Sequence, residues 1–235
     1  MNELEFKCGN PGASKFGNFI NYYQFHPPDE RISMLAPEIW SSAFKAARGC
    51  ALDVGCNSGD LTVALKDFLT NVVDTPISIL GVDVDPVLIR RACEKQSPRN
   101  LTFKCLDIMS DTGDIFTDFL KPRNRTRFDI VFCFSITMWI HLNHGDDGLR
   151  KFLAKVASLS DFLVIEPQPW KCYRTAVKRL KLGKAEFPNF KALQLRNNVE
   201  SEIETFIVDK CGLEKVGESG LTKWGRKLLF FKRNT

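Results

Sequence analysis

The chain has 235 residues and a mass of 26.7 kDa; 44% of the residues are apolar, 26% are charged, and the mean hydropathy is −0.16. A chain of this size can bury a sufficient core without disulfides or a metal, so we expect a single domain over residues 1–235. The net charge of +5 is compatible with an anionic partner. The longest apolar stretch, 128–140, is too short and too interrupted to span a membrane, which takes about 20 residues.

The eight cysteines show no spacing typical of a zinc site or a disulfide framework. Cys50, Cys105 and Cys133 lie inside apolar runs, where a free thiol behaves as a small hydrophobic side chain. The first residues, 1–5, lack the basic and apolar regions of a secretory signal. We therefore expect a reducing compartment, the cytoplasm or also the nucleus.

Short apolar runs alternate with helical patterns, which predicts an α/β fold with a mostly parallel sheet. Seven strands are expected, at residues 50–55, 77–84, 101–105, 128–134, 162–166, 213–217 and 227–232. Helices are expected at residues 59–69, 86–95, 148–158, 170–181 and 199–210. Asp85 and Pro86 are typical of a helix N-cap and first position. Residues 1–30 show no clear period, so we expect an irregular arm over the sheet, of the kind that forms lids.

A loop with two glycines separates the first strand from the first helix; it reads Asp53-Val-Gly55-Cys-Asn57-Ser-Gly59. Small residues at this place let the backbone approach a bound nucleoside, and we assign Asp53 and Gly55 to cofactor binding. The spacing fits neither a dinucleotide fingerprint nor a phosphate-binding loop, so NAD and ATP are disfavoured. Asn57 stands where methyltransferases usually carry glycine, which indicates either a weakened site or, as we favour, a contact with a methionine moiety.

Two acids follow the next strands. Asp83, with Val84 beside it, ends the second strand, where a carboxylate can accept both ribose hydroxyls. Asp107 and the backbone of Ile108 follow the third strand, where they can read an adenine. Together with the glycine loop, this arrangement favours S-adenosylmethionine as the cofactor.

Several longer strings are more specific than the glycine loop. They are Gly17–Tyr23, Arg31 before a Leu/Pro/Glu segment, Leu52–Gly59, Gly81–Asp85, Ser135–Asn143 and Glu166–Trp170. These strings resemble the Bicoid-interacting protein family of RNA 5′-phosphate methyltransferases, over about residues 16–175. The resemblance implies a Rossmann-like class I methyltransferase fold. It also implies S-adenosylmethionine held by Tyr22, Arg31, Gly55, Asn57, Asp83, Asp107, the Ile108 backbone and Phe134.

The resemblance extends to the substrate. The strings 25–28 and 137–139 are similar to the cytoplasmic branch of the family, which methylates the 5′-monophosphates of microRNA precursors and histidine tRNA. The nuclear branch carries arginine in place of His26 and lysine in place of Met138. A monophosphate has less charge than a triphosphate and needs fewer cations, which agrees with the residues found here.

A phosphate monoester has its second pKa at about 6, so its oxygen is already a nucleophile at pH 7 and needs positioning rather than a general base. We expect five side chains to act at the acceptor: His26, His141, Asn143, Glu166 and Gln168. For Glu166 and Gln168 this role is implied by the resemblance alone. His141 and His144 precede two aspartates, a pattern more typical of a loop entering a helix than of a metal site, and no metal is expected.

A cluster of cations without acids follows Trp170. The candidate RNA-binding residues are Trp170, Lys171, Arg174, Lys178 and Arg179. The cations form either a solvated helix face or, as we favour, a track for an RNA backbone. Trp139 and Trp170 either stack on a base or anchor the core.

The leading hypothesis is a monomeric enzyme that transfers methyl from S-adenosylmethionine to the 5′-monophosphate of a small structured RNA. Two alternatives remain open. One is a catalytically weak RNA-binding module of the same fold, and the other is a small-molecule methyltransferase.

Overall fold

A computed structural model describes residues 14–40, 48–73, 75–95, 100–110 and 113–234. At its centre lies one seven-stranded sheet in the order β3-β2-β1-β4-β5-β7-β6. The strands are β1 (Gly49–Val54), β2 (Ile77–Asp83), β3 (Leu101–Cys105), β4 (Phe128–Phe134), β5 (Ser160–Glu166), β6 (Leu213–Glu218) and β7 (Leu229–Arg233). Strands β1 to β5 are parallel, and β7 runs antiparallel between β5 and β6. The predicted fold class is confirmed.

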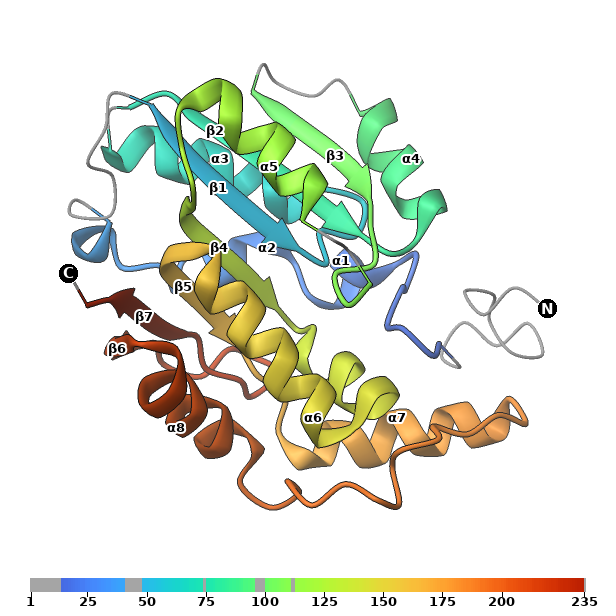
Figure 1. Cartoon of the computed structure of the whole chain (residues 1–235). Helices are drawn as coiled ribbons and strands as arrows, with labels where there is room; N and C mark the ends of the chain where they lie inside the picture. The colour runs from blue at the N-terminus through green and yellow to red at the C-terminus, as the bar shows by residue number, and fades with distance from the viewer. Residues whose placement is uncertain (1–13, 41–47, 74, 96–99, 111–112, 235) are drawn as a thin grey trace.

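Helices cover both faces of this sheet (Figure 1). They are α1 (Tyr22–Phe25), α2 (Pro28–Ile32), α3 (Asp60–Val73), α4 (Pro86–Glu94), α5 (Asp114–Leu120), α6 (Thr137–Ser158), α7 (Trp170–Leu182) and α8 (Val199–Cys211). Two short 3-10 helices, η2 (Pro37–Ile39) and η3 (Lys121–Arg123), complete the described elements. Side chains of α5, α6 and α8 pack with Leu52 of β1, whereas α3 packs with the neighbouring Ala51. Since neighbouring strand residues point to opposite faces, the two helix groups form separate layers.

The central strands are buried because helices cover them on both sides. All residues of β1 and β4 are buried, which explains why they read as continuous apolar runs rather than as alternating patterns. The parallel register aligns their carboxyl ends, with Asp53 of β1 beside Gly81 of β2 and Phe132 of β4. Residues that follow these strands are therefore brought to one edge of the sheet.

Local signals fixed some helix ends correctly and missed others. Helix α4 begins as predicted, with the Asp85 carboxylate accepting from the Val87 backbone N–H at 2.7 Å and Pro86 in the first position. The helix expected from Gly148 begins at Thr137 instead and is kinked at Gly145, so the 135–143 segment is helical after its first two residues. The N-terminal arm contains the short helices α1 and α2, and its residues 1–13 lie outside the described residues. Helix α5 was not expected.

Seven cysteines fall in the described part of the chain, and all are free thiols. Cys50 and Cys133 are buried as their apolar surroundings predicted, whereas Cys105 is exposed at the end of β3. The prediction for Cys105 is wrong because β3 is at the edge of the sheet formed by the described strands, and its last two residues are exposed. None of the described helices combines the length and the apolar character required to span a bilayer.

Candidate active site

An open cavity lies at the carboxyl ends of the central strands. Its walls come from the N-terminal arm, the loops after β1, β2, β3 and β4, and the first turns of α6. The sequence-predicted residues that line it are Tyr22, Gly55, Asn57, Asp83, Val84, Asp107, Ile108, Phe134 and Asn143. The parallel sheet thus brings together most of the predicted cofactor residues.

The glycine loop turns sharply beneath this cavity. Gly55 has a φ of +79°, and its N–H donates to the Val82 carbonyl at 2.8 Å. A Cβ at Gly55 would lie 3.2 Å from the Ile136 side chain, so the missing side chain leaves room between the loop and the start of α6. This is the space that a nucleoside cofactor needs to approach the backbone.

The side chain of Asn57 supports the arm. Its Nδ2 donates to the Phe19 carbonyl at 3.0 Å, and its Oδ1 accepts from the Ser58 backbone N–H at 2.8 Å. Asn57 also has a positive φ of 52°, a backbone conformation that asparagine tolerates better than most residues. Asparagine in place of glycine therefore leaves the loop intact and ties it to the arm.

The carboxylate of Asp83 stands at the end of β2 and closes the loop. It accepts from the backbone N–H groups of Asn57 at 2.9 Å and Asp85 at 3.0 Å. Burial raises the pKa of Asp83 to about 6, although these two hydrogen bonds act in the opposite direction. Each carboxylate oxygen keeps a second acceptor site, which fits ribose hydroxyls as ligands.

The adenine end is formed after β3. The Asp107 Oδ1 accepts from the Met109 backbone N–H at 2.9 Å, and the Ile108 carbonyl accepts from Lys155 Nζ at 2.9 Å. These bonds fix the turn that presents Asp107 to the cavity. The cavity combines two carboxylates, which accept hydrogen bonds, with a glycine loop and apolar walls. This combination fits a nucleoside that carries an uncharged base.

Besides Tyr22, the arm contributes three wall residues that the sequence analysis did not assign to the site. Phe16, Gly17 and Asn18 line the cavity, and Asn18 Nδ2 donates to Asp85 Oδ2 at 2.7 Å. Gly17 has a φ of +74°, and a Cβ there would lie 2.2 Å from the indole nitrogen of Trp139. Trp139 also packs edge-on against Phe19, with ring centroids 5.8 Å apart. The arm and α6 therefore meet and form adjoining parts of the cavity wall.

Asp53 was assigned to the cofactor, but the structure gives it a different role. Its side chain is buried, and its Oδ2 accepts from Thr62 Oγ1 of α3 at 2.7 Å. It does not line the described cavity. Asp53 joins the end of β1 to α3 and thereby positions the glycine loop that connects these two elements.

Arg31 also lies outside the cavity wall, in a buried ion pair with Glu166. Its Nε and Nη2 donate to Glu166 Oε2 at 3.0 and 2.7 Å, and both side chains are 0% exposed. Burial opposes charge on both groups, but Tyr22 and Glu166 raise the pKa of Arg31, and Arg31 and Arg226 lower the pKa of Glu166. The pair is therefore charged. It anchors α2 to the end of β5 and leaves one Arg31 nitrogen, Nη1, without a hydrogen-bond partner.

Two other acceptor candidates are used internally. His141 is fully buried between the Tyr173 hydroxyl, 3.1 Å from Nδ1, and Asp146 Oδ1, 2.7 Å from Nε2. Gln168 is also buried; its Oε1 accepts from the Thr137 hydroxyl and the Met138 backbone N–H at the start of α6. In this structure neither side chain lines the cavity: His141 points inward from α6, and Gln168, in the loop after β5, binds the first turn of α6.

Asn143 and His26 lie closer to the cavity. Asn143 Nδ2 donates to the carbonyls of Lys15 and Trp139, both at 2.8 Å, which ties the arm to α6. His26 stacks on Tyr22 with ring centroids 4.7 Å apart. Burial, with Arg226 and Arg31 nearby, lowers the pKa of His26 to about 4. The phosphate contact expected of His26 would therefore be made by a neutral imidazole, which can donate one ring N–H.

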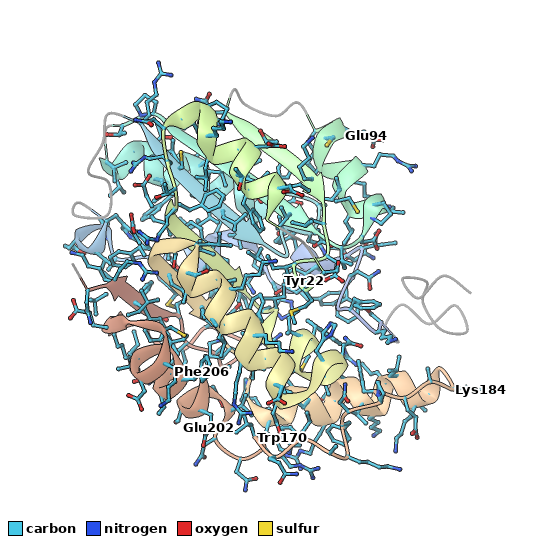
Figure 2. All side chains as sticks on the ribbon, in the orientation of Figure 1. Tyr22, Glu94, Trp170, Lys184, Glu202 and Phe206 are labelled. Carbon is cyan, nitrogen blue, oxygen red and sulfur yellow. The ribbon has the colours of Figure 1, made fainter. Side chains whose placement is uncertain are left out.

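The basic residues after Trp170 form the exposed side of α7. Lys171, Arg174, Lys178 and Arg179 are all exposed, and Figure 2 shows Trp170 at one end of this helix and Lys184 beyond the other. The ring of Trp170 stacks on Tyr173 and Phe190, with centroids 4.9 and 5.5 Å away. Trp170 is therefore used as an anchor, while the cations remain available to a partner.

The C-terminal hairpin contributes two residues that the sequence did not indicate. Trp224 Nε1 donates to Glu166 Oε1 at 2.7 Å, and Arg226 donates through Nη1 to Ser135 Oγ. Neither residue lies in a recognisable motif, and both are far from Ser135 in sequence. In the described ranges of the chain, no cluster of three or more His, Cys, Asp or Glu side chains is arranged to hold a metal ion.

Comparisons with known proteins show the family of the chain. A family model described as Bicoid-interacting protein 3 (Bin3) matches residues 128–233, and one described as a methyltransferase domain matches residues 52–161. The RNA 5′-monophosphate methyltransferase of Bos taurus is 46% identical over 94% of this chain and 82% of its own length. The pre-miRNA 5′-monophosphate methyltransferase of Xenopus laevis is 43% identical over 95% of this chain and 94% of its own.

Solved structures identify the fold. The N-methyltransferase NodS of Bradyrhizobium japonicum, in complex with S-adenosyl-L-homocysteine, superposes with a TM-score of 0.58 at 15% identity, covering 91% of each chain. The sheet order, the glycine loop and the acid after β2 thus define a class I methyltransferase, a class whose methyl donor is S-adenosylmethionine. Within this class, the chain belongs to the Bicoid-interacting protein 3 family.

Proposed function

We propose that this enzyme transfers a methyl group from S-adenosylmethionine to the 5′-monophosphate of RNA. The observation that supports the proposal is the pair of arginines behind Ser135, a residue that lines the wall of the cavity and accepts a hydrogen bond from each of them. The names of the relatives from Bos taurus and Xenopus laevis support the 5′-monophosphate as the acceptor.

The geometry suits an acceptor that needs no general base. S-adenosylmethionine supplies an electrophilic methyl group on a sulfonium, and Gly55, Asn57, Asp83 and Asp107 are placed to hold its nucleoside. The only task left to the protein is to bring a phosphate oxygen into line at about 3 to 3.5 Å from the methyl carbon. His141, which is buried and paired, and His26, which is neutral, are consistent with that simple requirement.

The test is transfer of labelled methyl to one RNA hairpin with a 5′-monophosphate, a 5′-triphosphate or a 5′-hydroxyl. We expect labelling of the monophosphate hairpin alone. Labelling of the hydroxyl hairpin would move the acceptor to a base or a ribose. If no RNA is labelled, a catalytically weak RNA-binding module or a small-molecule methyltransferase becomes the better interpretation.

Cofactor affinity should depend on pH through Asp83. The ionised carboxylate is the better acceptor for ribose hydroxyls, so affinity for S-adenosylhomocysteine should rise as the pH increases through about 6 and level off above it. The folding stability of the cofactor-free protein should change in the opposite direction. Because the pKa of Asp83 is raised in the folded state, protonation stabilises the fold, and this stabilisation is lost as the pH rises through about 6. Calorimetric titration across this pH range measures the first effect.

Two variants identify the group responsible. Asp83→Asn should remove the pH dependence together with most of the affinity. Asp53→Asn is the matched control, because burial also raises the pKa of Asp53 to about 6 although it does not line the cavity. A pH dependence that disappears in Asp53→Asn and persists in Asp83→Asn would refute the assignment.

We also propose that the exposed cations of α7 bind the RNA backbone. The double variant Lys178→Glu/Arg179→Glu should weaken RNA binding and reduce the log–log salt slope by about 1.4 to 1.8, the contribution of two phosphate contacts. The control is Arg90→Glu/Arg91→Glu, an equally exposed pair on α4. If both double variants weaken binding equally, the effect belongs to overall charge rather than to α7.

We also make proposals about the particular RNA substrates, the oligomeric state and the cellular compartment. We propose small structured RNAs, microRNA precursors and histidine tRNA, as substrates; the Xenopus laevis relative supports the first of these two. We further propose a monomer in the cytoplasm and also in the nucleus, in line with the seven free thiols of the described residues. Light scattering and cell fractionation test these two statements.

A further inference from the structure

Two arginines from distant parts of the chain meet at Ser135. Arg31 comes from α2, and Arg226 comes from the turn between β6 and β7. Arg31 Nη2 donates to Ser135 Oγ at 3.0 Å, Arg226 Nη1 donates to the same oxygen, and Ser135 Oγ donates to Glu166 Oε2 at 2.7 Å. Since Ser135 also lines the cavity, this cluster lies directly beside the cofactor site.

The single carboxylate of this cluster serves Arg31 rather than Arg226. Arg31 contacts Glu166 Oε2 with two nitrogens, whereas Arg226 Nη1 lies 3.9 Å from Oε1, an oxygen that already accepts from Trp224. The Arg226 Nη2 faces the sulfur of Cys172 at 3.8 Å, and sulfur is a weak acceptor. The charge of Arg226 is therefore poorly compensated.

Polar side-chain nitrogens without a hydrogen-bond partner gather at the same place. Of the five buried side-chain atoms that lack a hydrogen-bond partner in the described part of the chain, three belong here: His26 Nδ1, Arg31 Nη1 and Arg226 Nε. Burying a charged donor without an acceptor is costly, and the side chain of Arg226 is only 11% exposed. The cluster thus holds two guanidinium groups and one carboxylate, and it can accommodate a further anion.

The turn that carries Arg226 is held firmly in place. The Arg226 N–H donates to Thr222 Oγ1 at 3.0 Å, its carbonyl accepts from the Thr222 N–H at 2.8 Å, and the Lys223 N–H donates to Glu30 Oε1 of α2 at 2.9 Å. These bonds fix the hairpin against α2. The guanidinium is therefore positioned before a ligand arrives, which reduces the entropy lost on binding.

We propose that Arg226 binds the 5′-phosphate of the acceptor RNA and sets the preference for a charged 5′ end. A guanidinium fork matches two phosphate oxygens, and an uncompensated positive charge suits a dianion. Arg31 and Glu166 neutralise each other and hold Ser135 in place. The positive charge that contacts the phosphate therefore comes from Arg226. This inference rests on the proposed function, because it assigns the residue that recognises the same acceptor.

The test compares wild type with Arg226→Met on hairpin RNAs that differ only in a 5′-phosphate or a 5′-hydroxyl. We expect Arg226→Met to lower kcat/KM for the phosphorylated hairpin by about 100-fold, as for the loss of a charge-assisted contact. Affinity for S-adenosylhomocysteine and for the hydroxyl hairpin should be unchanged. Arg226→Lys should recover part of the activity, which guards against misfolding as the cause.

Lys227→Met is the control, since it removes the same charge from the neighbouring residue, whose side chain pairs with Glu218. It should retain wild-type kcat/KM. The inference is overturned if Arg226→Met is as active as wild type, or if it loses cofactor affinity by the same factor as activity. A wild type that methylates no 5′-phosphate would instead overturn the proposed function, so the two failures are distinguishable.

Discussion

Replacement of Gly55 by valine should lower affinity for S-adenosylhomocysteine by about 100-fold or more, equivalent to about 2.7 kcal/mol. A side chain there would be strained, because Gly55 has a φ of +79°, and its Cβ would lie 3.2 Å from Ile136. The added methyl groups would fill the space between the glycine loop and the start of α6. Calorimetric titration measures the change.

The matched control is Gly212→Ala. Gly212 also has a positive φ, +67°, at the end of α8, but a Cβ there would meet nothing within 4 Å. This variant should lose about 1 to 2 kcal/mol of stability from its backbone conformation and keep its cofactor affinity. Undiminished binding by Gly55→Val would place the cofactor elsewhere.

Replacement of Arg31 by methionine should lower the free energy of unfolding by about 3 kcal/mol or more, because Glu166 would remain charged and buried without its closest charged partner. Urea denaturation measures the loss. Adding Glu166→Gln should restore part of the stability, since the neutral amide avoids the cost of an unpaired carboxylate.

An exposed ion pair provides the comparison. Arg150 and Asp147 are 44% and 86% exposed, so Arg150→Met should cost at most about 1 kcal/mol. The resemblance assigns Arg31 to the cofactor, and the two roles predict different outcomes. Unchanged stability with lost cofactor affinity would favour the cofactor role over the structural one.

Much of the fold could be predicted because its signals are local. The run from Cys50 to Val54 is apolar throughout because the strand is buried on both faces, and Asp85 with Pro86 marks the start of α4 at the residues themselves. The positions of Gly55, Asp83 and Asp107 along the chain were sufficient to place them at one edge, since parallel strands align their carboxyl ends. The resemblance of several sequence strings to one family then indicated an RNA 5′-phosphate as the methyl acceptor.

The acceptor end was less predictable because its signals are not local. His141 reads as a free histidine in the sequence, but the early start of α6 turns it towards Tyr173 and Asp146. Arg226 lies in an unremarkable turn, and only the antiparallel pairing of β7 with β5 brings it to Ser135. No pattern within a single segment of the sequence predicts such a contact between distant residues.

The sequence by itself determined the α/β class, the nucleoside loop and the family, because these depend on residue type and spacing within single strand–loop–helix units. Only the tertiary structure decided which polar residues face the cavity and which serve the core. Asp53 and Arg31 carry the same charges in either role, but their pairing with Thr62 and Glu166 depends on elements that fold together from distant segments. Whether such a residue supports the fold or binds a ligand therefore depends on its burial and its hydrogen-bond partner rather than on its residue type.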